Sequence, residues 1–120
     1  MELICSYTRA DALEDGVLVD VSELAAEAGF RIPVAVTRGV WVQCVEVPRA
    51  CPWQDETGRL WDVLSVLRFA GQQNSEADRI VFPVMVQNTD GPAKPITLEA
   101  VIGPGDDGLP VLTVMLPGED

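Results

Sequence analysis

Two adjacent carboxylates, Asp106 and Asp107, lie between glycines in the stretch GPGDDG and raise the question of a metal or phosphate site. A calcium loop needs oxygen ligands at alternate positions and a distal Glu, whereas a phosphate loop needs a glycine-rich turn that opens a helix. Neither spacing is present. The Pro-Gly and Asp-Gly pairs are turn dipeptides, and alternating apolar residues flank them. The stretch therefore predicts a hairpin turn with a charged tip; a partner-facing tip and a metal or catalytic loop are the alternatives.

The rest of the chain offers few groups for catalysis. No histidine occurs among the 120 residues, which excludes Ser-His-Asp and Cys-His arrangements and the zinc helix H-E-x-x-H. The three cysteines, Cys5, Cys44 and Cys51, form no C-x-x-C motif and are interpreted as reduced, buried thiols, with a Cys44–Cys51 bridge as the alternative. No Walker A or dinucleotide-binding motif is present. We expect no enzymatic activity, no cofactor and no metal site.

Charge is the unusual bulk property. The chain has 19 acidic and 8 basic residues and a net charge of −11. Such a field repels nucleic acid and acidic membranes and attracts basic surfaces, although acidity also serves solubility alone. The basic residues are few and scattered, so we expect no direct binding of nucleic acid. The chain shows no membrane span and no signal peptide, which favours the cytoplasm.

The candidate binding residues are therefore surface acids and one aromatic side chain. Phe69 falls off the apolar stripe of its predicted helix, beside Asp62 and Ser65, as expected of a hot-spot aromatic on a polar face. The alternative is that a second element covers it. The predicted partner-binding residues are Asp11, Glu14, Asp15, Asp62, Phe69, Asp106 and Asp107.

The elements that position these residues fall into a helical first half and a strand-rich second half of a single domain, residues 1–120. The clearest helix is Asp55–Ala70, with an apolar stripe at helical spacing. Shorter helices are expected over Tyr7–Gly16, from an N-cap at Ser22 to Ala28, and over Gly39–Val47, where a strand is the alternative. Arg31–Val36, which contains a proline, is interpreted as an extended connector.

Three strands are expected in the second half, over Arg79–Gln87, Ile96–Ile102 and Val111–Leu116. Pro83 favours an edge or bulged position for the first of them. Short Gly/Pro connections join antiparallel neighbours. The predicted fold is α+β: a three- or four-stranded antiparallel sheet, built on this C-terminal meander, with helices packed on one face and Val17–Val21 as the fourth strand.

Several separate segments resemble an uncharacterised family of small acidic bacterial proteins found in plasmids, phages and integrated mobile elements. They are Tyr7–Val21 followed by Ala28-Gly29-Phe30, then Pro33–Arg38, Gly58–Leu64 and Ile102–Asp120. The resemblance covers nearly the whole chain and carries over no catalytic residue. It implies a context in which small acidic proteins block host nucleases or CRISPR effectors by occupying their basic nucleic-acid channels.

These observations favour a non-enzymatic interaction protein whose partner is a protein with a basic surface, such as a nucleic-acid-binding protein. In its sharper form it is an anti-defence inhibitor of the DNA-mimic type, acting by electrostatic steering and occupancy. One rival is a small carboxylate-based enzyme or ligand-binding domain, marked by a deep pocket with acids of raised pKa. The other is a structural homo-oligomer, marked by an exposed apolar patch around Trp53 or Phe69.

Overall fold

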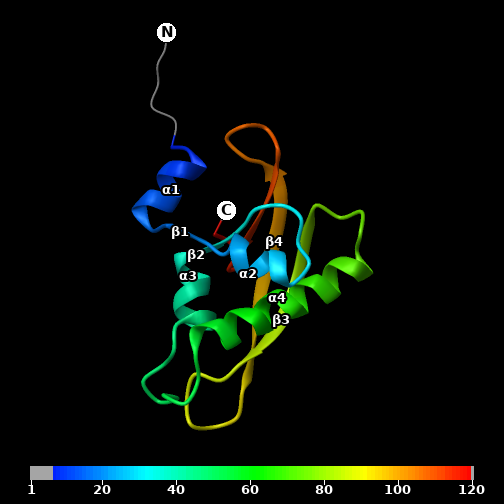
Figure 1. Cartoon of the computed structure of the whole chain (residues 1–120). Coiled ribbons are helices and arrows are strands. Elements are labelled where there is room, and N and C mark those ends of the chain that lie inside the picture. Colours follow the sequence, from blue (N-terminus) through cyan, green and yellow to red (C-terminus); the bar gives the residue numbers. More distant parts are fainter. Residues whose placement is uncertain (1–6, 120) are drawn as a thin grey trace.

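The computed structural model describes residues 7–119 and contains helices together with one sheet (Figure 1). In chain order the elements are α1 (Arg9–Asp15), β1 (Leu18–Asp20), α2 (Ser22–Glu27), β2 (Val34–Thr37), α3 (Arg38–Val40), the π-helix η1 (Trp41–Val45), α4 (Glu56–Gln73), β3 (Arg79–Val86), β4 (Lys94–Pro104) and β5 (Pro110–Met115). The α+β class predicted from the sequence is confirmed.

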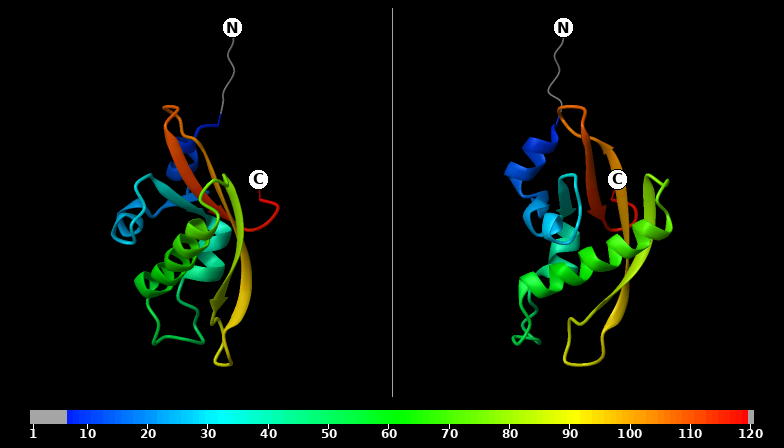
Figure 2. Two further views of the ribbon diagram at one scale, coloured as in Figure 1. Left: turned by 90° about the vertical axis from the view of Figure 1, so that its right-hand side faces the viewer. Right: turned by 45° about the vertical axis from the view of Figure 1, so that its right-hand side comes forward.

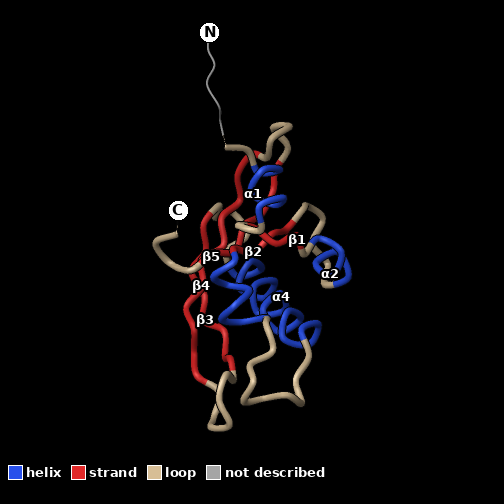
Figure 3. Tube along the Cα trace, turned by 90° about the vertical axis from the view of Figure 1, so that its left-hand side faces the viewer, coloured by secondary structure: helices blue, strands red, loops and turns tan. Residues whose placement is uncertain are grey.

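The sheet has five strands in the order β1-β2-β5-β4-β3 (Figure 3). The β3–β4–β5 part is the expected antiparallel meander, and β1 supplies the strand expected at Val17–Val21. However, β2 pairs with β5 in parallel, so the sheet is mixed. The prediction of a three- or four-stranded, wholly antiparallel sheet is therefore wrong in strand number and in one pairing.

The additional strand, β2, lies in the segment that the sequence analysis interpreted as a connector. Its residues Val34, Ala35 and Val36 are all buried, because elements cover both faces of the sheet here. A strand buried on both faces shows no apolar alternation, which is the usual sign of a strand. The parallel pairing with β5 is formed across the intervening α3, η1, α4, β3 and β4, far beyond the reach of any local signal.

Helix α4 lies across the inner face of the sheet and forms most of the core. It begins at Glu56, with Asp55 as N-cap accepting a hydrogen bond from the Gly58 N–H at 2.6 Å, and it continues to Gln73, three residues beyond the predicted end. Leu64 and Leu67 pack with Phe82 and Leu98 of the sheet in one buried cluster. Figure 2 shows α4 on one side of the long β3–β4 hairpin, while none of the described helices lies on the other side of that hairpin.

Helix α1 packs on the reverse face of the sheet. Ala35 of β2 is in register with Thr113 of β5. The neighbours of both residues along their strands belong to the core beneath α4. Because successive side chains of a strand point to opposite faces, those of Ala35 and Thr113 point away from α4. Arg9 of α1 donates to Thr113 Oγ1 at 2.6 Å, and Ala12 of α1 is buried. The expected packing of helices on one face therefore holds for α2, α3, η1 and α4, whereas α1 covers the other face above β1, β2 and β5.

The helix ends agree with the sequence in two places and differ in a third. The Thr8 side chain accepts a hydrogen bond from the Asp11 N–H in a capping box, and Gly16 ends α1 in the left-handed conformation, as predicted. The Gly39–Val47 segment is helical as predicted, as one turn of α3 followed by η1. Ser22, however, is not an N-cap; its hydroxyl instead bonds the Asp20 carboxylate and the backbone of Val34.

Strand β3 forms a free edge of the sheet, as Pro83 indicated. The Ile102 N–H donates to the Asp78 carbonyl oxygen at 2.8 Å. In an antiparallel pair, every second residue of a strand forms hydrogen bonds with the neighbouring strand. Counting from Asp78, the backbone groups of Val81, Pro83 and Met85 therefore point away from β4, toward the free edge. Because proline has no N–H, the middle of this edge lacks a donor for a further strand.

Candidate functional site

The side of α4 that faces away from the sheet carries two exposed aromatic residues. We call this surface the outward face of α4; its residues are Trp61, Asp62, Ser65, Arg68, Phe69 and Gln72. Phe69 is 64% exposed and Trp61 is 40% exposed, so no described element covers them. The alternative in which a second element covers Phe69 is therefore wrong.

A shallow hollow of about 320 Å³ lies between this face and α2. Trp61, Phe69 and Gln72 line it from α4, and Glu27 and Ala28 line it from the end of α2. The carboxylate of Glu27 thus lies at the rim of a surface that presents two aromatic rings. Aromatic side chains of this kind supply large contact area at low cost in conformational entropy when a partner binds.

The predicted acidic tip is largely occupied with interactions inside the protein. The Asp106 carboxylate accepts hydrogen bonds from the backbone N–H groups of Arg9 at 3.0 Å and Ala10 at 2.9 Å, so it caps the start of α1 from a distant loop. These bonds, together with the nearby charge of Arg9, lower the pKa of Asp106 below its usual value. Asp107 accepts from the Leu109 N–H at 3.0 Å within the turn. The hairpin turn predicted for this stretch is therefore present, linking β4 to β5.

The three predicted acids of α1 belong to the helix that lies beside this loop (Figure 3). Asp11 accepts a hydrogen bond from the Thr8 N–H in the capping box, and Asp15 accepts one from the Tyr7 hydroxyl at 2.9 Å. The Asp15 bond raises the pKa of Tyr7 above its usual value. Glu14 is exposed. The structure thus places Asp11, Glu14, Asp15, Asp106 and Asp107 at one end of the molecule, and Asp62 with Phe69 on α4.

Little of the negative charge is neutralised within the fold. Among residues 7–119, Arg79–Glu99 is the one ion pair formed between described side chains. The candidate acids Asp62 and Asp107 are exposed to solvent and have no described cation within pairing distance, whereas Asp106 lies near the charge of Arg9. An exposed, unpaired carboxylate contributes fully to the potential that a charged partner meets.

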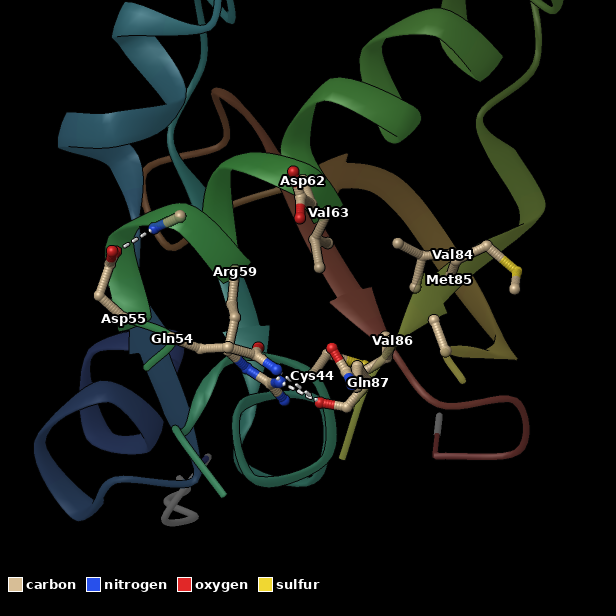
Figure 4. Close-up of a pocket in the computed structure, with 12 residues that line it drawn as sticks. Cys44, Gln54, Asp55, Arg59, Asp62, Val63, Val84, Met85, Val86 and Gln87 are labelled. Atoms are coloured by element: carbon tan, nitrogen blue, oxygen red, sulfur yellow. Dashed lines mark hydrogen bonds between the residues drawn. The ribbon is translucent and has the colours of Figure 1, made fainter. Parts of the chain in front are cut away.

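A second hollow, of about 450 Å³, lies between the start of α4, the end of η1 and the end of β3 (Figure 4). Its central residue is Arg59, which is 6% exposed. The five guanidinium N–H groups meet five neutral acceptors: the carbonyl oxygens of Val45 at 3.1 Å, Gln87 at 2.8 Å and Gln43 at 3.4 Å, and the side-chain oxygens of Gln54 at 2.8 Å and Asn88 at 2.7 Å. Burial lowers the pKa of Arg59. Because every donor is used, this guanidinium joins elements together and has no N–H left for an anion.

The two described cysteines are free and buried. Burial raises the pKa of the Cys44 thiol to about 11, so the thiol is protonated at neutral pH. The Cys51 thiol donates to the Thr89 carbonyl oxygen at 3.1 Å. The interpretation of reduced, buried thiols is confirmed for this pair, whereas Cys5 lies outside the described residues.

No three described Cys, Asp or Glu side chains converge closely enough to hold a metal ion. No helix within residues 7–119 is both long and apolar enough to cross a membrane.

Sequence reasoning missed three residues of these sites: Trp61, Glu27 and Arg59. Trp61 lies eight residues, about two helical turns, before Phe69, and this spacing is the signal that could have paired the two rings. Glu27 meets α4 only through the packing of α2, which no local pattern shows. Arg59 gave no signal, because its acceptors lie on η1, on the loop before α4 and at the end of β3.

Comparison with known proteins assigns the chain to a family. A family model with the description "Family of unknown function (DUF6573)" matches residues 1–120. The chain belongs to this family. No curated protein and no solved structure matches the chain significantly. The family resemblance noted in the sequence is thereby confirmed at the level of an uncharacterised domain that spans the whole chain.

Proposed function

We propose that this protein is a non-enzymatic interaction protein that binds a basic protein surface, with the outward face of α4 as the centre of contact. The observation that carries the proposal is the exposure of Trp61 and Phe69, beside Glu27, on a helix face that no described element covers. Asp62, the residue after Trp61, lies at the border between this face and the hollow at Arg59. Interface hot spots are enriched in such aromatic residues, and contiguous exposed apolar groups mark binding sites.

The charge of the molecule determines the kind of partner. A net charge of −11, with little internal pairing, steers basic surfaces toward the protein and opposes the approach of acidic ones. The acids at the α1 end, including Glu14 and Asp107, extend this field beyond α4. We therefore expect a partner with a basic surface, such as a protein that binds nucleic acids.

In its sharper form, the proposal is that this protein is an anti-defence inhibitor that occupies the nucleic-acid-binding surface of its partner. Small size, acidity and the resemblance to proteins of mobile elements support this form. It makes a specific demand, because an inhibitor that occupies a nucleic-acid channel must compete with the nucleic acid. Double-stranded DNA or RNA added to the complex should displace the protein from its partner.

The test is affinity purification from the native host, followed by binding measurements with the purified partner. We expect Trp61→Ala and Phe69→Ala each to weaken binding at least tenfold, as truncation of a hot-spot residue does. Trp53→Ala is the matched control, because Trp53 is as exposed as Phe69 but lies in the loop before α4. Equal effects of Trp53→Ala and Phe69→Ala would refute the assignment of the α4 face.

The structural homo-oligomer is the second candidate, favoured by a different surface from the one predicted. Val81 and Met85 are 63% and 59% exposed on the outer side of β3, which none of the helices in residues 7–119 covers (Figure 2). Light scattering after size exclusion tests this candidate. Met85→Lys should convert a dimer to a monomer. The control is Val42→Lys, which places the same charge at an exposed valine outside β3 and should leave the mass of the dimer unchanged.

A further inference from the structure

The inner face of the sheet is not fully covered by α4, and an apolar groove remains at its end. Ile80, Ile102 and Leu112, from three neighbouring strands, line the groove together with Leu67 of α4. Phe30 and Ile32 line it from the segment between α2 and β2, and all of these residues except Leu67 and Leu112 retain some exposure to solvent. The groove has a volume of about 420 Å³, within the range of roughly 300–1,000 Å³ usual for small-ligand sites.

The charge of this groove is opposite to that of the molecule. Its lining contains Arg31 and Arg68 and no Asp or Glu, although the chain has 19 acids and 8 bases. Both arginines are exposed, and neither forms an ion pair or a hydrogen bond with another described residue. The Arg68 guanidinium lies against Gly29, where an added Cβ would come within 2.8 Å of its Nε. Two unpaired guanidinium groups therefore lie at an apolar groove.

We infer that this groove binds a medium-chain fatty acid, with the chain along Ile80, Ile102 and Phe30 and the carboxylate at Arg31 and Arg68. An aliphatic chain removes apolar surface from water on both sides of the contact. Arginine forms strong, often bidentate hydrogen bonds with a carboxylate. The inference does not rest on the proposed binding of a basic partner, because it uses the opposite charge and a groove that shares only Arg68 and Gln72 with the outward face of α4.

The net negative charge does not prevent the binding of such an anion. At physiological ionic strength the Debye length is about 8 Å, so exposed acids farther away than this are largely screened. Glu76 and Asp78, next to the lining residues Ser75 and Ala77, are closer and offset part of the attraction. The nearest charges are the two guanidinium groups of the lining itself. They favour a carboxylate over an alcohol of the same length.

Titration calorimetry with decanoate tests the inference, with decanol and acetate as comparison ligands. We expect saturable binding of one decanoate per chain, binding of decanol at least tenfold weaker, and no binding of acetate. Arg31→Gln and Arg68→Gln should each weaken decanoate binding at least fivefold. Arg49→Gln removes the same charge from an exposed loop and should change nothing.

A variant that fills the groove supplies an independent test. Gly71 of α4 lines the groove, and a Cβ built on it meets no atom within 4 Å. Gly71→Leu should therefore fold, as circular dichroism would show, and abolish decanoate binding. The inference is overturned if decanoate shows no saturable binding or if decanol binds as well as decanoate. It is also overturned if Arg49→Gln weakens decanoate binding, or if Gly71→Leu folds and still binds decanoate.

Discussion

At the scale of single residues, Asp106 shows how a side chain predicted to face a partner also serves the fold. Its carboxylate accepts two backbone hydrogen bonds from the start of α1, across 96 and 97 residues of sequence. The sequence predicted the turn that carries Asp106, because turn dipeptides act locally. It could not predict the contact with α1, because that contact depends on the placement of α1 on the reverse face of the sheet.

This contact predicts a pH dependence of stability. The pKa of Asp106 is lower in the folded protein than in the unfolded chain. Its stabilising contribution is therefore complete above the unfolded pKa and is lost as the pH falls through the lower, folded pKa. Asp106→Asn should lower the melting temperature at neutral pH and reduce the loss of stability on acidification. Asp107→Asn, which keeps an acceptor for Leu109, should do neither; equal behaviour of the two variants would contradict this role.

Arg59 gives a second prediction at this scale, because it is a buried cation held by neutral acceptors. Arg59→Met removes all five hydrogen bonds and leaves the carbonyl oxygen of Val45 buried without this donor, whereas the Gln87 carbonyl oxygen still accepts from the Gln54 side-chain amide. Breaking a buried charged network in this way costs about 3 kcal/mol or more in the free energy of unfolding. Chemical denaturation measures it. Arg49→Met, in an exposed loop, should cost less than about 0.5 kcal/mol, and a similar small loss for Arg59→Met would show that the network contributes little.

At the scale of elements, the sequence predicted those whose signals are local. The long helix, the C-terminal meander and the edge position of β3 followed from apolar periodicity, short connections and Pro83. The strand β2 could not be recognised, because burial on both faces removes its alternation. For the site, the periodicity of α4 separated Phe69 from the core stripe, whereas the contribution of Glu27 depended on the packing of α2.

A prediction at this scale concerns two glycines with opposite roles. Gly71 lies in the last turn of α4 with open space around it, so Gly71→Ala should raise the free energy of unfolding by about 0.5 kcal/mol through helix propensity. Gly29 has a φ of +105°, and an added Cβ would meet Arg68. Gly29→Ala should therefore lower stability by about 1 kcal/mol or more. Thermal unfolding should show a higher melting temperature for Gly71→Ala than for the unchanged protein and a lower one for Gly29→Ala. A Gly29→Ala variant that is more stable than the unchanged protein would contradict the prediction.

At the scale of the whole molecule, function is expected to depend on the shape and charge of surfaces. The protein presents an aromatic face on α4 beside Asp62, and acids at the α1 end. Its charged hollow at Arg59 is internally satisfied, and its groove near Arg68 carries the opposite charge. The groove shares Arg68 and Gln72 with the outward face of α4, and Asp62 also lines the hollow at Arg59. Substitutions of residues that belong to one surface alone, such as Phe69 or Arg31, therefore separate the two binding proposals.

The central claim is that a basic partner binds at the outward face of α4, and the salt dependence of its Kd tests this most directly. We expect the affinity to fall steeply with added salt, because exposed charges are screened. Asp62→Asn should reduce that dependence, whereas Asp90→Asn, which removes the same charge from the β3–β4 loop, should leave it unchanged. An affinity that does not change with salt, or equal effects of the two substitutions, would contradict the claim.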